Sequence, residues 1–280
     1  IRLLEEELGI QIFIRSGKRV VSVSQPGKAV LEISERILRD VQNIKNIGSE
    51  FTDHDSGSLT IATTHTQARY ALPKIVAEFV KNYPKVNLTI KQGSPSAIAQ
   101  MVSSGEADLA IITERIDDHP ELGKLPCYEW NHAVIVPHDH PLLDCRNPLS
   151  LEDLASFPLV TYEFAFNSGS SIARTFNKAH IEQPDVALSA ADTDVLKTYV
   201  RLGLGVGLMA KMAYDPVVDQ DLQLIDAAHL FEPSPTWIAL RTDTYLRGYA
   251  YDFIQMFAPK LTREAVDRIL YTPVVEDFSI

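Results

Sequence analysis

The stretch "SLTIATTHTQARYALPKIVAEFVKNYPKVNLTIKQG", residues 58–93, decides the fold class. It opens with a short apolar strand pattern, passes through a polar turn into an amphipathic helix pattern, and ends in a second strand pattern. This order predicts two parallel strands joined by a right-handed crossover. The alternation continues with a helix pattern at 95–107 and a strand pattern at 108–114. We therefore expect an α/β domain with a largely parallel sheet.

A second block of the chain has the same alternating order of strand and helix patterns. Its strand and helix patterns alternate at 132–137, 150–157, 158–164, 170–181, 185–190 and 194–210. The last segment contains Gly203, Gly205 and Gly207. We expect these glycines to allow a tight turn from a helix into a strand. They do not form a dinucleotide-binding motif, because their spacing differs and the helix precedes the strand. The sequence thus predicts two α/β units.

The polar turn after the first strand groups uncharged hydrogen-bonding side chains at one place. Thr64, Thr66 and Gln67 follow the strand and precede the helix, and Thr113 ends the strand pattern at 108–114. In parallel sheets, ligands gather at the carboxyl ends of strands beside helix N-termini, which attract anions. The pattern is typical of an anion-binding site. The alternative is simple capping of a helix or turn by the threonine hydroxyls.

The first residues of the chain carry a different signal. Residues 12–23, "IFIRSGKRVVSV", place Arg15, Lys18 and Arg19 around Ser16-Gly17 between two short alternating patterns. This predicts a β-hairpin with a basic tip, which could lie on DNA phosphates. The alternative is a solvated turn without a partner.

A long amphipathic helix is predicted next. From Pro26 to Ile47, apolar residues recur at three- and four-residue steps up to Gly48. Such a stripe suits a helix that packs on a partner helix, although it could also dock on its own domain. The polar residues 51–58 then read as a linker.

Composition limits the choice of function classes. The 280 residues are 45% hydrophobic and carry a formal net charge of -11. Residues 1–50 hold eight basic and seven acidic residues, so the balance there is +1 and the rest of the chain carries -12. We find no long apolar run or secretory signal, and expect a cytoplasmic protein without a membrane partner. The first residue is Ile1, so we also expect the natural polypeptide to begin further upstream.

Catalytic and metal-binding motifs are not recognisable in the sequence. Cys127 and Cys145 are too few for a disulfide framework or a four-ligand zinc site, and the "HDH" at 138–140 has no neighbouring ligand. Neither a nucleophile elbow, nor a phosphate-binding loop, nor a diagnostic carboxylate pair is present. We therefore expect no metal, no cofactor and no enzymatic activity.

Several of these stretches resemble one known family. "ELGIQIFIRSGKR" (7–19) is similar to the end of the winged helix-turn-helix of LysR-type transcriptional regulators. "TTHTQARYALP" (63–73) and "KTYVRLGLGVG" (197–207) resemble the members of that family that activate the cysteine regulon. The resemblance covers essentially the whole chain, except that the family's recognition helix would precede Ile1.

The resemblance implies a fold of two Rossmann-like subdomains, like a periplasmic binding protein, after a winged helix-turn-helix remnant and a long linker helix. It places the parts at 1–25 (DNA-binding remnant), 26–57 (linker and dimerisation helix) and 58–280 (effector-binding domain). Within the last part it implies subdomain I at 58–128 with 233–280, and subdomain II at 129–232.

The resemblance also implies a function. It suggests a regulator of sulfur-assimilation and cysteine-biosynthesis genes that binds promoter DNA as a tetramer, with RNA polymerase as a further partner. A small anion, acetylserine or a sulfate-like ion, would bind through Thr64, Thr66, Gln67 and Thr113. A further family threonine corresponds to Asn167, which can still donate a hydrogen bond. Two alternatives remain at this point: a bilobal anion-transport receptor, and an enzyme built on the same fold.

Overall fold

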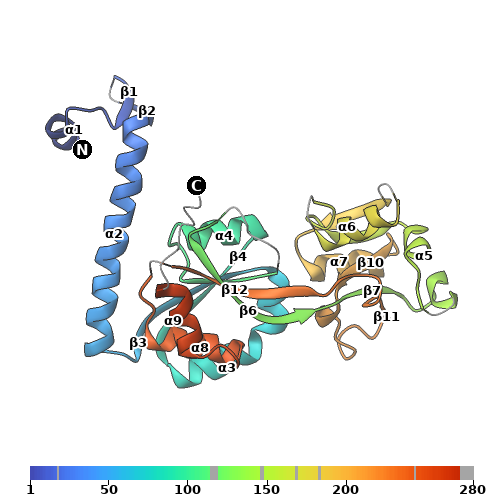
Figure 1. The fold of residues 1–280 in the computed structure, drawn as a ribbon. Helices are drawn as coiled ribbons and strands as arrows, with labels where there is room; N and C mark the ends of the chain where they lie inside the picture. The colour runs from blue at the N-terminus through green and yellow to red at the C-terminus, as the bar shows by residue number, and fades with distance from the viewer. Residues whose placement is uncertain are drawn as a thin grey trace, which may run out of the picture. The chain divides into compact units, whose positions relative to one another are not determined.

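The computed structural model describes residues 1–17, 19–113, 119–145, 148–167, 170–181, 184–242 and 244–271. The chain divides into two compact units (Figure 1). The first unit contains Ile1–His54 and Thr244–Gly248, and the second contains Asp55–Asp243 and Tyr249–Ile280.

The first unit contains the predicted hairpin and long helix. Its elements are α1 (Arg2–Leu8), β1 (Phe13–Ser16), β2 (Arg19–Val23) and α2 (Gln25–Thr52). β1 and β2 pair antiparallel across a turn in which Gly17 has a φ of 62°, a conformation that favours glycine. The Ser24 hydroxyl accepts a hydrogen bond from the Gly27 amide at 2.9 Å and caps α2. The predicted basic hairpin is confirmed as a structural element.

Helix α2 is longer than the sequence predicts. It continues through Gly48 to Thr52, so the predicted linker at 51–58 shrinks to residues 53–55. Two features explain the difference. A side chain at Gly48 would meet nothing within 4 Å, so its helical position there costs only backbone entropy. Glu50, in the last turn, pairs with Arg247 at 3.0 Å and accepts from the Gly248 amide.

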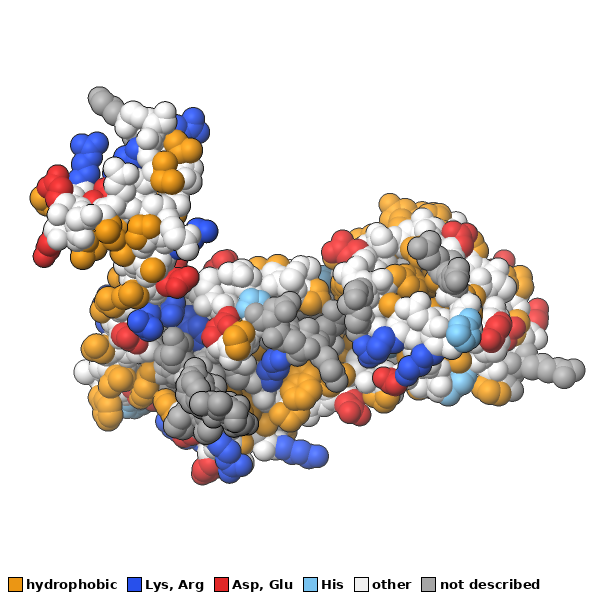
Figure 2. Space-filling view, turned by 45° about the horizontal axis from the view of Figure 1, so that its top comes forward, with side chains coloured by type: hydrophobic (Ala, Val, Ile, Leu, Met, Phe, Trp, Pro, Cys, Tyr) orange, Lys and Arg blue, Asp and Glu red, His pale blue; other side chains and the backbone are white. Residues whose placement is uncertain are grey.

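The apolar stripe of α2 is largely open to solvent within this chain. Ile37 and Ile44 are 56% and 68% exposed, and Leu38 is 68% exposed. Figure 2 shows hydrophobic side chains at the surface of this helix, on the left of the view, among charged ones. An exposed apolar face on a helix is typical of a surface that packs against another element.

The second unit contains two five-stranded sheets. The first sheet has the strand order β4-β3-β5-β12-β6. Its strands and the helices nearest to them in sequence are β3 (Ser56–Thr63), α3 (Pro73–Asn82), β4 (Lys85–Gln92), α4 (Pro95–Ser103), β5 (Leu109–Ile112), β6 (Leu122–Trp130), β12 (Ser234–Arg241), α8 (Gly248–Phe257) and α9 (Arg263–Tyr271). β3 pairs parallel with both β4 and β5, as predicted.

The second sheet has the order β11-β7-β10-β8-β9. Its elements are β7 (His132–Pro137), α5 (Leu151–Ala155), β8 (Leu159–Tyr162), α6 (Ser171–Lys178), β9 (Val186–Ala190), α7 (Thr193–Arg201), β10 (Val206–Ala210) and β11 (Leu222–Asp226). β8 pairs parallel with β9 and β10. A buried core that includes Leu154, Phe176 and Leu208 packs around this sheet.

Both sheets are mixed, whereas the alternating pattern predicts largely parallel sheets. β12 runs antiparallel to β5 and β6, and β7 runs antiparallel to β10 and β11. The chain passes between the sheets twice, from β6 into β7 and from β11 into β12 (Figure 1). Prolines at Pro126 and Pro235 interrupt the strand patterns of β6 and β12, which made these two strands hard to recognise from sequence.

The glycine-rich passage into β10 has the predicted role. Gly203 follows α7 with a φ of 75°, in the left-handed region that ends many helices. A side chain at Gly205 would come within 2.2 Å of the Pro158 carbonyl oxygen. The glycines therefore allow the turn and the close packing of strands.

Among the described residues, none of the helices combines the length and the apolar character that spanning a bilayer demands.

Candidate functional site

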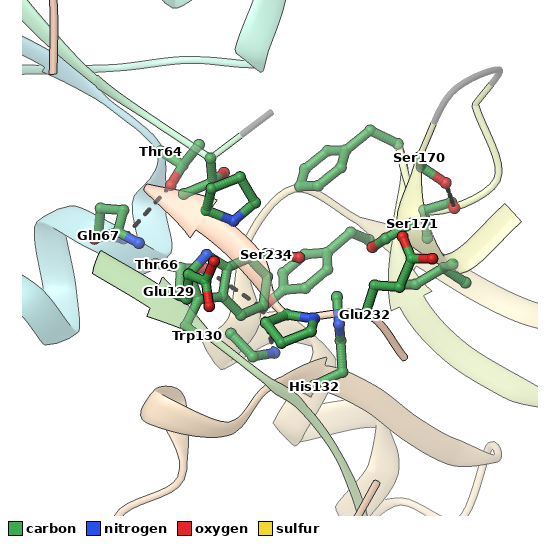
Figure 3. A pocket seen from close by; sticks show the side chains of 18 of the residues that line it. Thr64, Thr66, Gln67, Glu129, Trp130, His132, Ser170, Ser171, Glu232 and Ser234 are labelled. Atoms are coloured by element: carbon green, nitrogen blue, oxygen red, sulfur yellow. Dashed lines mark hydrogen bonds between the residues drawn. The ribbon is translucent and has the colours of Figure 1, made fainter. Parts of the chain in front are cut away.

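A cleft of about 730 Å³ lies where strands of the two sheets end within the second unit (Figure 3). Its walls come from both sheets and from the passages between them. The lining residues are Thr64, Thr66, Gln67, Thr113, Glu129, Trp130, His132, Tyr162, Phe164, Ala165, Ser170, Ser171, Ile172, Arg174, Ala210, Glu232, Pro233, Ser234, Pro235 and Trp237. Hydroxyl, amide and charged groups thus face one space together with aromatic rings.

Four residues singled out in the sequence meet in this cleft. Thr64, Thr66 and Gln67 follow β3, and Thr113 follows β5. β3 and β5 are parallel neighbours, with Thr63 opposite Ile111. Their carboxyl ends therefore lie at the same edge of the sheet, which brings together side chains that are nearly fifty positions apart in the sequence.

Thr64 lies at the start of a helical segment. Its carbonyl accepts a 3.0 Å hydrogen bond from the Ala68 amide, and its hydroxyl lies 3.5 Å from the Gln67 amide nitrogen. Residues Gln67–Ala71 form a π-helical turn before α3. The capping alternative thus holds in part for Thr64, by a long hydrogen bond to its hydroxyl.

Thr66 connects the two sheets. Its hydroxyl lies 2.9 Å from the Thr193 hydroxyl and 3.4 Å from that of Tyr162, which is itself 3.0 Å from the Thr193 hydroxyl. The Ala210 amide donates to the Tyr162 hydroxyl at 3.2 Å. We call Thr66, Tyr162 and Thr193 the hydroxyl triad. All three side chains are buried, and the Thr66 side chain makes no capping bond.

Gln67 is fixed by a residue that the sequence pattern did not single out. The Tyr128 hydroxyl donates a 2.5 Å hydrogen bond to the Gln67 Oε1, and the Gln67 side chain is buried. Its Nε2 has a weak contact with the Met212 sulfur at 4.0 Å. With Oε1 occupied, the amide NH₂ is the group of Gln67 that remains for donating hydrogen bonds.

Asn167 lies elsewhere than the resemblance implies. It is exposed and is not among the cleft-lining residues. Its carbonyl accepts from the Ser170 amide at 3.1 Å, in the turn that leads into α6. Ser170 and Ser171 line the cleft instead, and the Ser170 hydroxyl caps α6 by accepting from the Ala173 amide at 3.0 Å. A second helix N-terminus therefore faces the cleft, and the neighbouring residues 168–169 lie outside the described part of the chain.

Three charged side chains line the cleft. Glu232 lies 3.1 Å from Lys178 and 3.7 Å from Arg174, and the hydrogen bond from Lys178, more than any other interaction, lowers the pKa of the Glu232 carboxyl. Glu129, on β6, is exposed to the cleft, and no ion pair with it is found among the described residues. Sequence patterns gave no sign of these three side chains, because they come from three separate elements.

Aromatic rings line the cleft beside these charged side chains. The rings of Trp130 and His132 lie 4.7 Å apart, and His132 lies 5.3 Å from Phe231. His132 is only 3% exposed, and burial lowers the pKa of its imidazole to about 4. His132 is therefore neutral at physiological pH and offers a hydrogen-bonding ring without charge.

Beyond the cleft, the sheets are joined by charged and hydroxyl groups. The Tyr70 hydroxyl donates to Asp194 at 2.5 Å and accepts from Lys197 at 3.2 Å. Burial and then the Asp194 carboxylate raise the pKa of Tyr70. His65, Asp192 and Asp194 could hold a metal ion by their spacing, but Asp194 is already engaged by Tyr70 and by Arg69 at 3.3 Å. We assign this group to the contact between the sheets.

The basic hairpin is a second candidate site. Arg15 pairs with Glu5 of α1 at 2.7 Å, and this hydrogen bond is the main cause that lowers the pKa of Glu5 to about 2. Arg15 therefore holds the hairpin to α1. Arg19 is exposed at the start of β2, and Lys18 lies outside the described residues.

Comparisons with known proteins agree with one another. The family model described as "LysR substrate binding domain" matches residues 52–262. The HTH-type transcriptional regulator SsuR of Burkholderia cenocepacia is 50% identical over 270 residues, which cover 96% of this chain and 87% of the relative. The HTH-type transcriptional regulator CysB of the same organism is 49% identical over 267 residues, 95% and 85% of the two chains.

A solved structure supports the same relationship. The crystal structure of the cofactor-binding domain of the Cbl transcriptional regulator superposes with a TM-score of 0.71 at 39% identity. It covers 78% of this chain and 95% of that chain.

Proposed function

Because this chain belongs to the LysR family of transcriptional regulators, we propose that it controls sulfur-assimilation and cysteine-biosynthesis genes in response to a small effector in its cleft. The relatives are named transcriptional regulators, which agrees with the interpretation that the chain is not an enzyme. A small-molecule effector, and no resident cofactor, is what this family membership supports. The transport receptor is not favoured, since neither the family match nor the relatives point to it.

We infer the effector site from one observation. Thr64, Thr66, Gln67 and Thr113 converge on one cleft from two parallel strand ends, beside the N-terminus of the helical segment that begins after Thr64. The N-terminus of α6 faces the same cleft through Ser170 and Ser171. Hydroxyl and amide donors beside a helix N-terminus can hold oxyanions in proteins. We infer that the effector presents an anionic head, as acetylserine or a sulfate-like ion does.

The charge of the chain makes short-range donors necessary. Residues 51–280 carry a formal charge of -12, which repels anions at a distance. Affinity must therefore come from hydrogen bonds inside the cleft, each contributing about 1.5–3 kcal/mol when one partner is charged. Loss of one such bond lowers affinity about ten- to a hundredfold.

Thr66→Val tests the site in binding calorimetry with sulfate and acetylserine. The structure adds a complication, because Thr66 also bonds to Thr193 across the sheets. Thr193→Val is the matched control: it removes the same bond between the sheets, but Thr193 does not line the cleft. We expect Thr66→Val to lose about ten- to a hundredfold in affinity and Thr193→Val to lose much less. Equal losses in both variants would mean that the Thr66 hydroxyl acts by closing the sheets. Unchanged binding in Thr66→Val and Gln67→Ala would reject the site.

The arrangement of the rest of the chain follows from the same proposal. Residues 1–25 form part of a winged helix-turn-helix, 26–57 link it to the effector-binding domain at 58–280, and that domain has subdomains at 58–128 with 233–280 and at 129–232. The basic hairpin contacts DNA phosphates through Arg19, Lys18 and, in part, Arg15. The exposed apolar face of α2 supports a homo-oligomer, for which we propose a tetramer. DNA as the partner places the protein in the cytoplasm, where contact with RNA polymerase would complete activation.

A further inference from the structure

Among the residues that the structure describes, one carboxylate in the cleft has no cationic partner. Glu129 projects from β6 beside Trp130, on the wall that also carries Thr66 (Figure 3). The other lining carboxylate, Glu232, is balanced by Lys178 at 3.1 Å and Arg174 at 3.7 Å. No cation is paired with Glu129 in the described parts of the chain, and residues 114–118 are not among them.

The cleft is therefore bipolar. The groups that favour an anion include the hydroxyls of Thr64 and Thr113, the Gln67 side-chain amide and Arg174, and the N-terminus of α6 lies beside them. Glu129 in the same space repels an anion and attracts a cation. A simple dianion such as sulfate satisfies the first group and is repelled by the second. A molecule with an anionic head and an ammonium group satisfies both.

We propose that the natural effector is a small zwitterion, whose carboxylate or sulfonate lies against the hydroxyl and amide donors and whose ammonium group pairs with Glu129. This inference rests on the proposed function, because it assumes that the cleft holds the effector. The cavity volume of about 730 Å³ is in the range of small-molecule sites, about 300–1,000 Å³. The rings of Trp130 and Phe164 line the cleft and offer an apolar wall for the rest of such a molecule.

Two pairs of probes isolate the ammonium group. O-acetylserine and N-acetylserine are isomers, and only the first has a free ammonium group. Taurine and isethionate are both sulfonates, and only taurine has an ammonium group where isethionate has a hydroxyl. The two pairs also distinguish a carboxylate head from a sulfonate head. Calorimetric titrations are run at mildly acidic pH, where the acetyl group does not migrate from oxygen to nitrogen.

Glu129→Gln removes the charge with little change in shape, and Glu78→Gln on α3 is the control. Glu78 is exposed, does not line the cleft and changes the net charge equally. We expect the wild type to prefer the ammonium-bearing member of at least one pair. Glu129→Gln should lower the affinity for that ammonium-bearing member about three- to tenfold. Its affinity for sulfate and for the member without an ammonium group should stay the same or rise.

The outcomes separate this inference from the proposed function. Equal affinity of the wild type for both members of each pair would overturn the proposal of a zwitterionic effector. Equal changes of affinity in Glu129→Gln and Glu78→Gln would also overturn it. If those same ligands lose more affinity in Thr66→Val than in Thr193→Val, the effector site itself stands. If none of the probes, sulfate included, binds the wild type, both the zwitterion and the effector site are rejected.

Discussion

The hydroxyl of Thr66 lies where the two sheets of the second unit meet. Its position after β3 could be predicted from the sequence, since strand ends beside helix starts are where polar side chains gather. Its partners could not, because Thr193 is 127 positions away and Tyr162 is 96 positions away. The same residue thus lines the cleft and holds the sheets together, which suits a residue that senses an effector.

The buried imidazole of His132 gives a prediction on pH. Its pKa falls from an ordinary value of 6.5 to about 4 in the folded protein, so the unfolded chain binds a proton first as the pH is lowered. The free energy of unfolding of the second unit should therefore fall between pH 6.5 and pH 4, by about 3 kcal/mol in total from this group.

Urea unfolding at several pH values measures this slope. His132→Phe should flatten the dependence in that window, whereas His180→Asn, which removes an exposed histidine of the same unit, should leave it in place. An unchanged slope in His132→Phe would show that other groups cause the acid sensitivity.

The pair of Lys197 and Asp219 gives a prediction on stability. The two side chains are 3% and 1% exposed and lie 2.6 Å apart. Asp219 also accepts from Arg201 at 2.8 Å and from the Asp215 amide at 3.0 Å. Burial acts to raise the pKa of Asp219, but these hydrogen bonds outweigh it and lower the pKa.

Asp219→Ala should lower the free energy of unfolding by about 3–5 kcal/mol, because it takes the Asp219 carboxylate away from the buried Lys197 ammonium, and the Tyr70 hydroxyl at 3.2 Å does not neutralise that charge. The double variant Lys197→Met with Asp219→Leu removes both charges and should recover a large part of the loss. Equal instability of the single and double variants in urea unfolding would show that packing, and not the unpaired charge, is responsible.

At the scale of elements, α2 carries the prediction on assembly. Ile37 and Ile44 are 56% and 68% exposed on the apolar face of this helix. Replacing both by Lys should lower the oligomeric state in sedimentation velocity, because charges would have to be buried in the contact. Glu32→Lys, a charge change at an exposed position of the same helix, should not. A chain beginning at Ser58 that keeps the native oligomer would assign assembly to the effector-binding domain.

The hairpin formed by β1 and β2 gives separate predictions for its two described arginines. Arg19→Glu should weaken binding of the full-length protein to all DNA sequences alike and lower the salt dependence of binding. Arg15→Ala should in addition free Glu5, so the hairpin should become less stable at neutral pH, where the carboxylate is charged in both states. DNA titrations at several salt concentrations, with acid unfolding of each variant, measure both effects. Unchanged affinity in Arg19→Glu would remove the hairpin from the DNA interface.

The elements themselves were predictable to different degrees. β3, β4 and β5 with α3 and α4 follow from plain periodicity, since each carries its own apolar pattern. β6, β11 and β12 did not stand out, because they pair antiparallel between distant parts of the chain and two of them contain proline. The π-helical turn at Gln67–Ala71 has no sequence signal that separates it from an α-helix. The resemblance to the LysR family is confirmed. Its division of the domain into 58–128 with 233–280 and 129–232 implies two passages of the chain between the subdomains, which periodicity alone does not predict.

The candidate site was predictable only where its residues follow strands that the sequence pattern itself predicts. Thr64, Thr66, Gln67 and Thr113 follow two parallel strands, and the cleft includes all four. Glu129, Glu232 and Arg174 come from a strand, a passage and a helix, so only the folded chain brings them together. The charges that select among effectors are thus the part that the sequence could not show.

For the whole molecule, we propose that effector binding and DNA binding are coupled. If an effector changes the affinity for DNA by some factor, DNA must change the affinity for the effector by the same factor. Coupling of this kind typically amounts to 1–3 kcal/mol, or about five- to 150-fold. The hydroxyl triad, which includes Thr66, joins the two sheets. We therefore expect that a bound effector would act by changing how far the two sheets close on the cleft.

The most direct test measures the DNA affinity of the full-length protein at fixed salt, with and without saturating effector, using whichever of the acetylserines, taurine or sulfate binds in calorimetry. We predict a shift of at least fivefold in the wild type, and the same factor in effector affinity when DNA is saturating. At an effector concentration that saturates only the wild type, the shift should vanish in Thr66→Val. A wild-type DNA affinity that does not respond to any bound effector would rule out this coupling, and an equal response in Thr66→Val at that concentration would show that the Thr66 hydroxyl has no part in it.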